Sequence, residues 1–511
     1  MKRLFISALT ACTLLFASSC QDWLDVNHDP NVLGEIPSGK VLLPAAQVGI
    51  GNNLMGWDMG FAGGFWSEYW TQKHTASQFK FLCEYNETSF QTAYRSLTSG
   101  VLKDLYKIKN DAQKAGDNGL YFIAEALSIF TWQTITDVWG DIPYFEALKG
   151  EEGIGAPKFD KGEDIYADLN KRIDELLKVD LNKATVDSKY DFIYGGDMEQ
   201  WMKFANSLKL KLMLRVSETS GYNNATVLSF VKSANLLTSS AKISGKNWSD
   251  GEEGKRHPMR EYQEGGANYL STNVIACKNF VDYLANNSDP RVANLFTMSD
   301  KKTGAYRGAI FGDFDSKEAS DGSKADKDVT YSQVTFASDM DLMLMSTWEV
   351  NFYVAEVYAR AADYATAKTF YEAGVRASLA QHGISDEAIL SGYAQWTANT
   401  QDAAIEQIAM QRWVANANYQ HIESFLERNR TKYPALYPLD IVLNRKAAFA
   451  DPKVIGHLTI AVNGRAKLNA SLPVAPIYPD EVVNRNPNSP EQKPNLGVKV
   501  WWNTKAEVVV Q

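Results

Sequence analysis

The six histidines of the 511-residue chain do not have the spacing of a catalytic metal centre. They stand at positions 28, 74, 257, 382, 421 and 457, and none belongs to an H-E-x-x-H pair, which would place two imidazoles on one helical face. The chain also lacks a G-x-S-x-G nucleophile elbow and a G-x-x-x-x-G-K-[ST] phosphate loop. The sequence therefore predicts no catalytic residue, no metal ligand and no cofactor.

Carboxylates are abundant, and they leave two alternatives open. A glycosidase needs two opposed carboxyl groups, and the 61 acidic residues always supply candidates. Asp58 and Glu68 flank an aromatic stretch, but we interpret them as solvated surface charges. The acidic run at 313–328 could bind calcium through oxygen ligands. Its spacing does not match an EF-hand, which favours a solvated charge run.

Aromatic side chains, 12% of the chain, gather beside planar polar groups in two places. In "WDMGFAGGFWSEYW" (57–70) the rings recur in steps of four residues, which is typical of a helix whose stripe is mostly core. Trp70 ends this stripe and leads into the loop "TQKHTASQFKFLCEYNE". A sugar ring stacks its apolar face on an aromatic ring, and its hydroxyls bind planar polar groups. The loop offers both.

The second place is a segment rich in Gly, Ser, Asp and Lys at about 220–346, where aromatic and arginine residues are interspersed. Any one of these residues alone is more typical of a loop anchor, whereas the group favours a ligand surface. The predicted ligand-binding residues of the two segments are Trp66, Trp70, Gln72, His74, Tyr85, Trp248, Tyr306, Arg307, Phe311 and Tyr331.

The first 19 residues have the pattern of a secretory signal peptide. Lys2 and Arg3 precede an apolar stretch that is too short to span a membrane as a stable helix, and small residues follow it. The end of this segment at Cys20 resembles the lipobox of bacterial lipoproteins, in which the cysteine is acylated and becomes the N-terminus. Ala17 departs from the Leu that this pattern prefers, and ordinary cleavage near Ala17 is the alternative.

Composition excludes a nucleic-acid partner, because the formal net charge is −9 and the basic residues are dispersed. No segment after the leader is long and apolar enough to cross a bilayer. Two cysteines remain outside the leader, Cys83 and Cys277. We interpret them as buried thiols that do not bond, and a disulfide is the alternative.

The elements that must position these residues are mainly helices. Apolar residues recur with the helical period at 118–135, 199–215, 347–361, 364–381, 402–416 and 419–430. Short links group them as pairs: 88–115 with 118–138, 163–179 with 198–217, and 402–416 with 419–430. The stretch "YARAADYATAKTFYEAGVRAS" resembles a tetratricopeptide-repeat helix pair. The sequence predicts a mainly α fold with a large loop-rich insertion and an irregular C-terminal segment after Lys432.

Four stretches are similar to SusD/RagB-like nutrient-binding outer-membrane lipoproteins. They are "TDVWGDIPYFEAL" (136–148), "DFIYGGDMEQWMKFANSLKLKLMLRVSE" (191–218), "EQIAMQRWVANANYQHIESFLERNRTKYP" (406–434), and "YPDEVVNRNPNS" (478–489) with "KVWW" (499–502). "DWLDVNHDPN" after Cys20 resembles the family's start. The likeness covers the mature chain and is weakest in the insertion and in the loop after Trp70.

The resemblance implies one domain over 20–511, with helix pairs as the scaffold and loops as the ligand face. It also implies a lipid-anchored protein at the outer membrane, facing the cell exterior, that does no chemistry. Such a protein binds oligosaccharide fragments and delivers them to a SusC-like TonB-dependent transporter. A peptide receptor of the same architecture, a lipid-anchored glycosidase and a structural repeat adaptor remain as alternatives.

Overall fold

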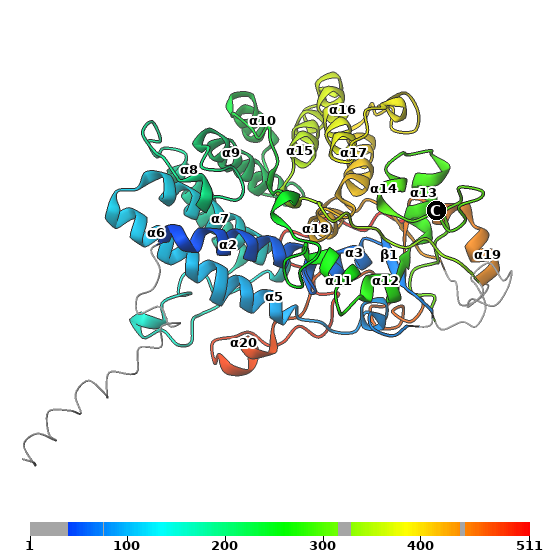
Figure 1. Cartoon of the computed structure of the whole chain (residues 1–511), viewed down its shortest axis with the longest axis horizontal. Coiled ribbons are helices and arrows are strands. Elements are labelled where there is room, and N and C mark those ends of the chain that lie inside the picture. Colours follow the sequence, from blue (N-terminus) through cyan, green and yellow to red (C-terminus); the bar gives the residue numbers. More distant parts are fainter. Residues whose placement is uncertain (1–38, 75, 315–328, 440–444) are drawn as a thin grey trace, which may run out of the picture.

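Helices make up most of the structure. The computed structural model describes residues 39–74, 76–314, 329–439 and 445–511 (Figure 1). The α-helices are α2 (Gly39–Leu54), α3 (Met59–Trp66), α4 (Lys80–Cys83), α5 (Gln91–Arg95), α6 (Lys103–Ala115), α7 (Asn118–Trp139), α8 (Gly162–Leu176), α9 (Met198–Arg215), α10 (Asn224–Ser233), α11 (Pro258–Glu264), α12 (Tyr269–Asn273), α13 (Lys278–Asn286), α14 (Val292–Leu295), α15 (Thr347–Arg360), α16 (Tyr364–Gln381), α17 (Gln401–Asn416), α18 (His421–Thr431), α19 (Arg445–Ala450) and α20 (Asp480–Arg485).

Shorter elements connect these helices. A π-helix, η1 (Ser96–Leu102), joins α5 to α6. The 3-10 helices are η2 (Gly150–Glu152), η3 (Ser188–Tyr190), η4 (Gly245–Asn247), η6 (Ala388–Ser391) and η7 (Pro452–Val454). The strands are β1 (Trp70–Gln72), β2 (Ala241–Ile243), β3 (Val274–Ala276), β4 (Leu342–Met345), β5 (Leu436–Tyr437) and β6 (Leu458–Thr459).

The predicted helix pairs are present, which confirms the mainly α fold. Helix α6 packs on α7, α8 on α9, α15 on α16 and α17 on α18 (Figure 1). Asp117 caps α7 by accepting a hydrogen bond from the Leu120 amide at 2.9 Å, and Asp363 caps α16 in the same way from Thr366 at 3.1 Å. A capping side chain satisfies amides that have no partner inside the helix, so these links can be short.

Helix α3 lies unusually close to the start of α18. A Cβ atom added to Gly63 would come within 2.5 Å of the His421 backbone, so only glycine allows this approach. The contact places the aromatic residues of α3 against the core, where Phe61 and Phe65 are fully buried.

The insertion is more regular than the loop-rich segment that the sequence predicts. It contains α10 to α14, and one antiparallel strand pair, β1 with β3, fastens it to the first helices, whereas β2 and β4 both lie within the insertion. Strand β1 pairs with β3, with Trp70 opposite Ala276, and β2 pairs with β4. Strand β1 is therefore held between the first helices and the insertion.

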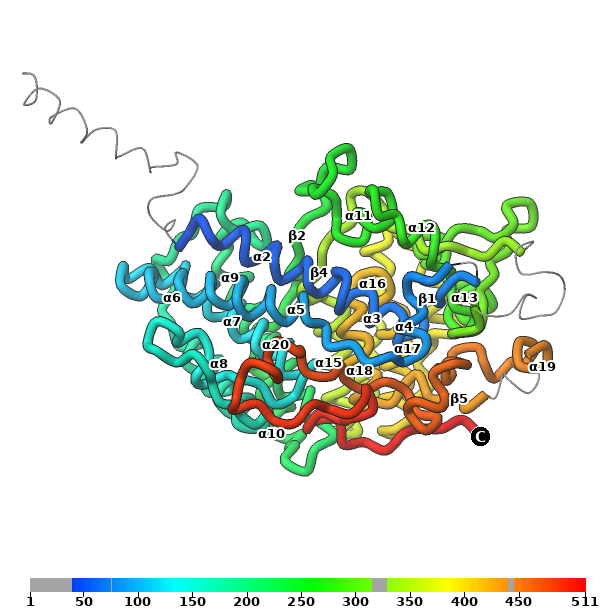
Figure 2. Tube along the Cα trace, turned by 90° about the horizontal axis from the view of Figure 1, so that it is seen from below, coloured from blue at the N-terminus to red at the C-terminus, as the bar shows by residue number. Residues whose placement is uncertain are grey.

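The C-terminal segment runs along one side of the helices (Figure 2). Strands β5 and β6 are parallel, and Leu436 also forms backbone hydrogen bonds with Val508 and Val510. Trp502 is fully buried, and the Arg215 guanidinium of α9 lies 5.3 Å from its ring centroid. The segment thus packs against the helical body.

Candidate functional site

Six of the ten predicted ligand contacts are buried: Trp66, Trp70, Gln72, Tyr85, Phe311 and Tyr331. Trp70 has no exposed surface, and the rings of Phe61, Phe65 and His421 lie within 6.1 Å of it, all edge-on. A ring without an exposed face cannot stack on a sugar. Burial therefore argues against direct ligand contact by these six residues in this conformation, and their side chains pack in the core beneath the loops.

The polar ends of three of the buried residues, Trp66, Gln72 and Tyr85, have partners inside the protein, whereas the buried indole N–H of Trp70 has none among the described residues. The Tyr85 hydroxyl accepts a hydrogen bond from the Ala461 amide at 3.0 Å, and the Trp66 indole donates to the Leu82 carbonyl at 3.2 Å. Gln72 accepts from the Phe79 amide at 2.8 Å and donates to the Lys73 carbonyl. These hydrogen bonds stabilise the loop, so the polar groups of these three side chains are already paired within the protein.

The other four predicted contacts, His74, Trp248, Tyr306 and Arg307, are partly exposed. Trp248 donates its indole N–H to the Met340 carbonyl at 3.0 Å, which is an anchoring contact. Tyr306 and Arg307 line a cleft of about 590 Å³ together with Lys278, Asp282 and Phe449. Most of this cleft's lining is polar, and Tyr306 and Phe449 are its only rings among the described residues.

A smaller cleft, which we call the Trp57 cleft, has both aromatic rings and polar groups in its lining. It has a volume of about 320 Å³ and lies where α2 ends, α3 and α5 begin, and the segment before α11 crosses them. It is lined by Asn52, Asn53, Gly56, Trp57, Asp58, Thr92, Ala93, Gly254, Arg256, Pro258, Glu261 and Tyr262. Its walls therefore come from the first helices and from the insertion.

Two half-buried rings form the apolar part of the Trp57 cleft. Trp57 packs against Phe61, Phe79, Tyr262 and Tyr269, with centroid distances of 5.2 to 5.5 Å. This packing fixes the ring while part of it stays exposed. The indole N–H of Trp57 and the hydroxyl of Tyr262 form no hydrogen bond with any residue that the structure describes, so both can bind a ligand.

Charged groups form the polar part of the Trp57 cleft. Arg256 donates to both carboxylate oxygens of Glu261, at 3.2 and 3.3 Å, and to the Asp250 carbonyl at 2.7 Å. Asp58 accepts a hydrogen bond from the Ala93 amide at 2.8 Å. Burial raises the pKa of Asp58 above its usual value, and backbone amides partly oppose this. The cleft thus offers two ring surfaces, two free donors and a carboxylate.

The sequence pattern placed Trp57 in the buried stripe and Asp58 among solvated charges, so both were missed. Helix α3 starts at Met59, which leaves Trp57 in the turn before it. Gly56, Trp57 and Asp58 could have marked that turn, because glycine and aspartate favour helix starts. Because the rings recur with the helical period throughout 57–70, the sequence pattern did not show that the helix begins at Met59.

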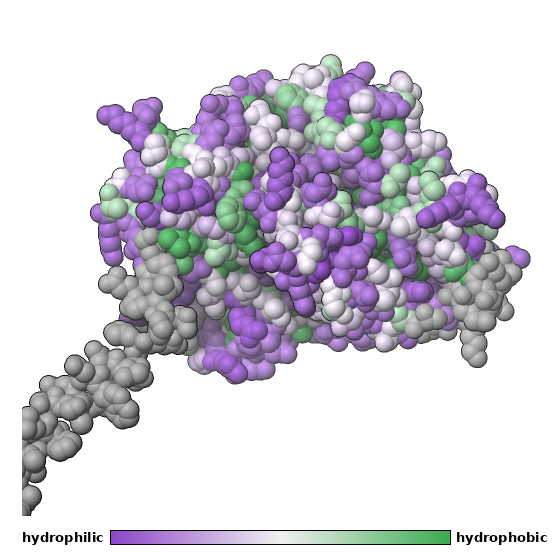
Figure 3. Space-filling view, viewed as in Figure 1, coloured by the Kyte–Doolittle hydropathy of each residue, from purple (hydrophilic) through white to green (hydrophobic). Residues whose placement is uncertain are grey.

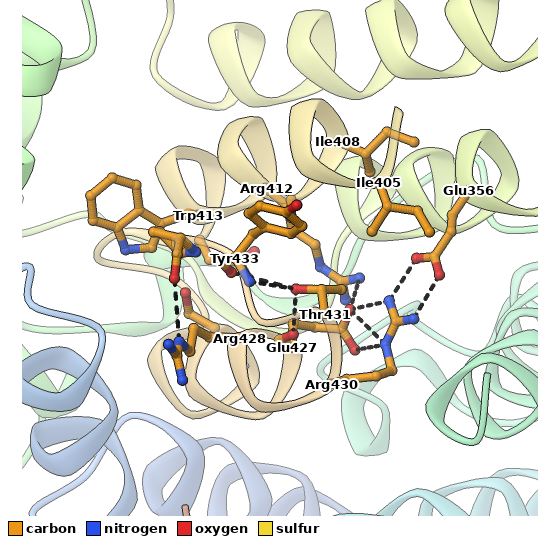
Figure 4. A pocket seen from close by; sticks show the side chains of 14 residues that line it. Glu356, Ile405, Ile408, Arg412, Trp413, Glu427, Arg428, Arg430, Thr431 and Tyr433 are labelled. Carbon is orange, nitrogen blue, oxygen red and sulfur yellow. Dashed lines mark hydrogen bonds and ion pairs between the residues drawn. The ribbon is translucent and has the colours of Figure 1, made fainter. Parts of the chain in front are cut away.

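The interior also contains a cavity, but it is a structural feature. It has a volume of about 10 Å³ and lies among charged side chains of α15, α17 and α18 (Figure 4). Glu356 pairs with Arg430 at 2.6 Å, and Glu427 pairs with Arg412 at 2.7 Å. A space of this size holds about one water molecule and no sugar.

Within the described part of the chain, no group of three or more His, Cys, Asp or Glu side chains could hold a metal ion. The Asp residues of the acidic run at 315–328 lie outside the described residues, while Asp313 pairs with Arg445 at 2.7 Å. Cys83 and Cys277 are buried and unbonded, in agreement with the interpretation from the sequence. Burial raises the pKa of Cys83 to about 12, so this thiol is not a nucleophile at neutral pH.

Comparison with known proteins now identifies the class. A family model described as "Starch-binding associating with outer membrane" matches residues 33–451. The chain therefore belongs to the SusD-like family, an outer-membrane-associated family of nutrient-binding proteins, as its sequence resemblance implies. In the described part of the chain, no helix combines the length and apolarity that a membrane span requires.

Solved structures show the same fold at low sequence identity. A SusD homologue from Bacteroides uniformis is 22% identical, with 91% of this chain and 99% of that chain covered and a TM-score of 0.68. A SusD homologue from Bacteroides fragilis is 21% identical, with coverages of 92% and 100% and a TM-score of 0.68. A chitin-binding protein is 21% identical, with coverages of 92% and 100% and a TM-score of 0.69. Among curated proteins, none matches the chain significantly.

Proposed function

We propose that this protein captures oligosaccharide fragments in the Trp57 cleft and delivers them to a SusC-like TonB-dependent transporter. The observation that carries the proposal is the pair of fixed, half-exposed rings beside free hydrogen-bond donors. Family membership supports a carbohydrate ligand, since the family is described as starch-binding. The cleft of Tyr306 and Arg307 is a second candidate contact for the same ligand.

The proposal makes the protein a binding protein and not an enzyme. The cleft contains two carboxylates, but Glu261 is engaged by Arg256 and by the Gly254 amide at 3.1 Å. A retaining or inverting glycosidase needs a second carboxyl group that is free to act as nucleophile or base. Asp58 alone does not supply this pair.

We also propose how the protein is placed in the cell. Residues 1–19 are a signal peptide, Cys20 carries the lipid anchor, and 20–511 form a single ligand-binding domain at the outer membrane. Residues 1–38 lie outside the described residues, so support for the anchor comes from the sequence. The largest hydrophobic cluster reaches from Leu43 to Trp502, which supports one domain.

The proposed function predicts that Trp57→Ala weakens glycan binding without unfolding the protein. A carrier must release its ligand, so we expect affinities from micromolar to millimolar, about −8 to −4 kcal/mol. One stacked ring then supplies a large share of the binding, and its loss should weaken affinity roughly tenfold or more, about 1.4 kcal/mol. The ligand is first found with an array of neutral and acidic glycans and peptides, and affinities are then measured by calorimetry.

Trp396→Ala is the matched control, because Trp396 is also partly buried but lies near Tyr371 of α16, away from the cleft. It should leave glycan affinity unchanged. Tyr306→Ala separates the two clefts. If Trp57→Ala binds glycan like the wild type and Tyr306→Ala does not, the Trp57 cleft is not the site. Binding of peptides alone, or release of reducing sugar, would contradict the proposed function.

A further inference from the structure

The charges of the Trp57 cleft do not cancel. Its charged lining residues are Asp58, Arg256 and Glu261. Arg256 and Glu261 form an ion pair at 3.2 Å and neutralise one another. Asp58 has no cationic partner among the described residues, and its hydrogen bonds come from the backbone amides of Ala93 and Thr92. The cleft therefore carries one uncompensated negative charge, next to Trp57 in the chain and facing the same space.

The surroundings of Asp58 strengthen the electrostatic effect of its charge on a ligand. The carboxylate is partly buried, and partial burial reduces the screening of a charge by water and salt. One oxygen is held by the Ala93 amide near the start of α5, which fixes the group in place. The Thr92 amide also donates to the carboxylate. A carboxylate has more acceptor positions than these two amides fill, so it can accept a further hydrogen bond from a ligand hydroxyl.

We propose that Asp58 makes the Trp57 cleft selective for uncharged oligosaccharides and against acidic ones, such as those bearing uronate groups. Hydroxyls donate strong, charge-assisted hydrogen bonds to a carboxylate. A uronate in the same place is repelled and must also lose water without gaining a cation. Specificity of this kind rests on rejecting the wrong ligand as well as on binding the right one. This inference rests on the proposed function and names the ligand class of the same site.

Asp58 also has a structural role, because it accepts the Ala93 amide near the start of the helix that continues through η1 and α6. Asp58→Ala would remove that acceptor and could unfold this end of the helix. Asp58→Asn keeps a side-chain carbonyl for Ala93 and removes only the charge. The asparagine variant therefore tests selectivity apart from folding, and thermal unfolding of both proteins checks this.

The test uses a matched pair of ligands. The neutral oligosaccharide that binds best in the array is oxidised at its primary hydroxyls, which gives a uronate derivative of the same linkage and length. The quantity measured is the ratio of the two affinities. In the wild type we expect the neutral ligand to bind at least about tenfold more tightly. In Asp58→Asn this ratio should fall at least about fivefold.

Asp187→Asn is the matched control, since Asp187 is an exposed acid beside Lys189 and does not line the cleft. It should leave the ratio unchanged. A wild type that binds both ligands equally, or an Asp58→Asn variant that keeps the wild-type ratio, overturns the inference while glycan binding itself stands. If no glycan binds to the wild type, the proposed function fails and the inference fails with it.

Discussion

At the scale of single residues, burial decides which acidic groups are free for function. Glu68 was interpreted from the sequence as a solvated surface charge, but only 1% of it is exposed. It accepts hydrogen bonds from the Thr459 amide at 2.7 Å and from the Asn279 side chain at 2.6 Å. Burial raises the pKa of Glu68 to about 8, although these hydrogen bonds oppose the shift. Glu68 therefore links Asn279 of the insertion to Thr459 of the C-terminal segment.

This pKa predicts that Glu68 makes the protein less stable as pH rises from about 5 to 8. In that window the folded protein keeps the proton of Glu68, while the unfolded chain, with a pKa near 4.5, has lost it. The free energy of unfolding then falls with rising pH, by on the order of 3 kcal/mol for this group. Well above pH 8 both states are ionised and the penalty stays constant.

Glu68→Gln should remove this pH dependence, because an amide does not titrate. Denaturant unfolding of the wild type and the variant at pH 5, 6, 7 and 8 measures it. Other groups, including the buried histidines, titrate alike in both proteins, so the difference between the two curves isolates Glu68. We expect the variant to gain stability relative to the wild type at each step upward in pH. Parallel curves would show that Glu68 is ionised in the folded protein.

At the scale of elements, helical periodicity predicted the apolar buried face of α9. Trp201 and Phe204 of α9 are fully buried, as their spacing indicates. Lys211 lies on the same helix and is charged, yet it is buried and pairs with Glu349 and Glu423 at 2.8 Å. A pattern of apolar and polar residues cannot distinguish a buried ion pair from a solvated charge, because the partners are remote in sequence.

Phe204→Ala should therefore destabilise the protein by about 3–5 kcal/mol, as expected for a large ring removed from a packed core. Glu199→Ala on the same helix is the control, since 71% of that side chain is exposed. It should change the free energy of unfolding by about 0.5 kcal/mol or less. Chemical denaturation of both variants measures this. Equal, small losses would show that the buried face of α9 has been misidentified.

The short strands that the sequence did not predict pair with distant segments of the chain. Strand β1 has three residues and pairs with β3, so that Trp70 lies opposite Ala276. Such short strands have no measurable period of their own, and their pairing is decided by the tertiary fold. The predicted ligand loop therefore looked free in the sequence. Its aromatic residues are buried because the insertion, α18 and the C-terminal segment all pack against them.

At the scale of the whole molecule, stretches that resemble the family meet in one buried ion cluster. Asp137 of the first stretch pairs with Arg215 of the second at 2.8 Å. Arg215 also pairs with Glu423 of the third at 2.7 Å, and Arg430 of the third pairs with Glu356 of α15 at 2.6 Å. Breaking one such buried pair is costly, because the remaining charge has no partner. These stretches are therefore structural.

The surface around the proposed ligand-binding cleft differs from this buried cluster. Figure 3 shows that the side bearing α11 and α12 is largely hydrophilic, with small hydrophobic areas scattered over it. Such a face has no single large apolar patch that a sequence pattern would mark. The Trp57 cleft is assembled from residues about 200 positions apart, 52–58 and 254–262. Its aromatic content was visible in the sequence, but its geometry was not.

The whole molecule must also be held at the membrane, and the leader predicts how. If Cys20 carries the lipid anchor, Cys20→Ala should move the protein from the outer-membrane fraction to the soluble fraction, because several acyl chains on one residue supply the attachment. The experiment is done in cells that lack the transporter, so that a protein partner cannot retain the variant. Cys83→Ala is the control, since Cys83 is buried in the core and should leave the attachment intact. A Cys20→Ala protein that still fractionates with the outer membrane would show that another part of the chain holds it there.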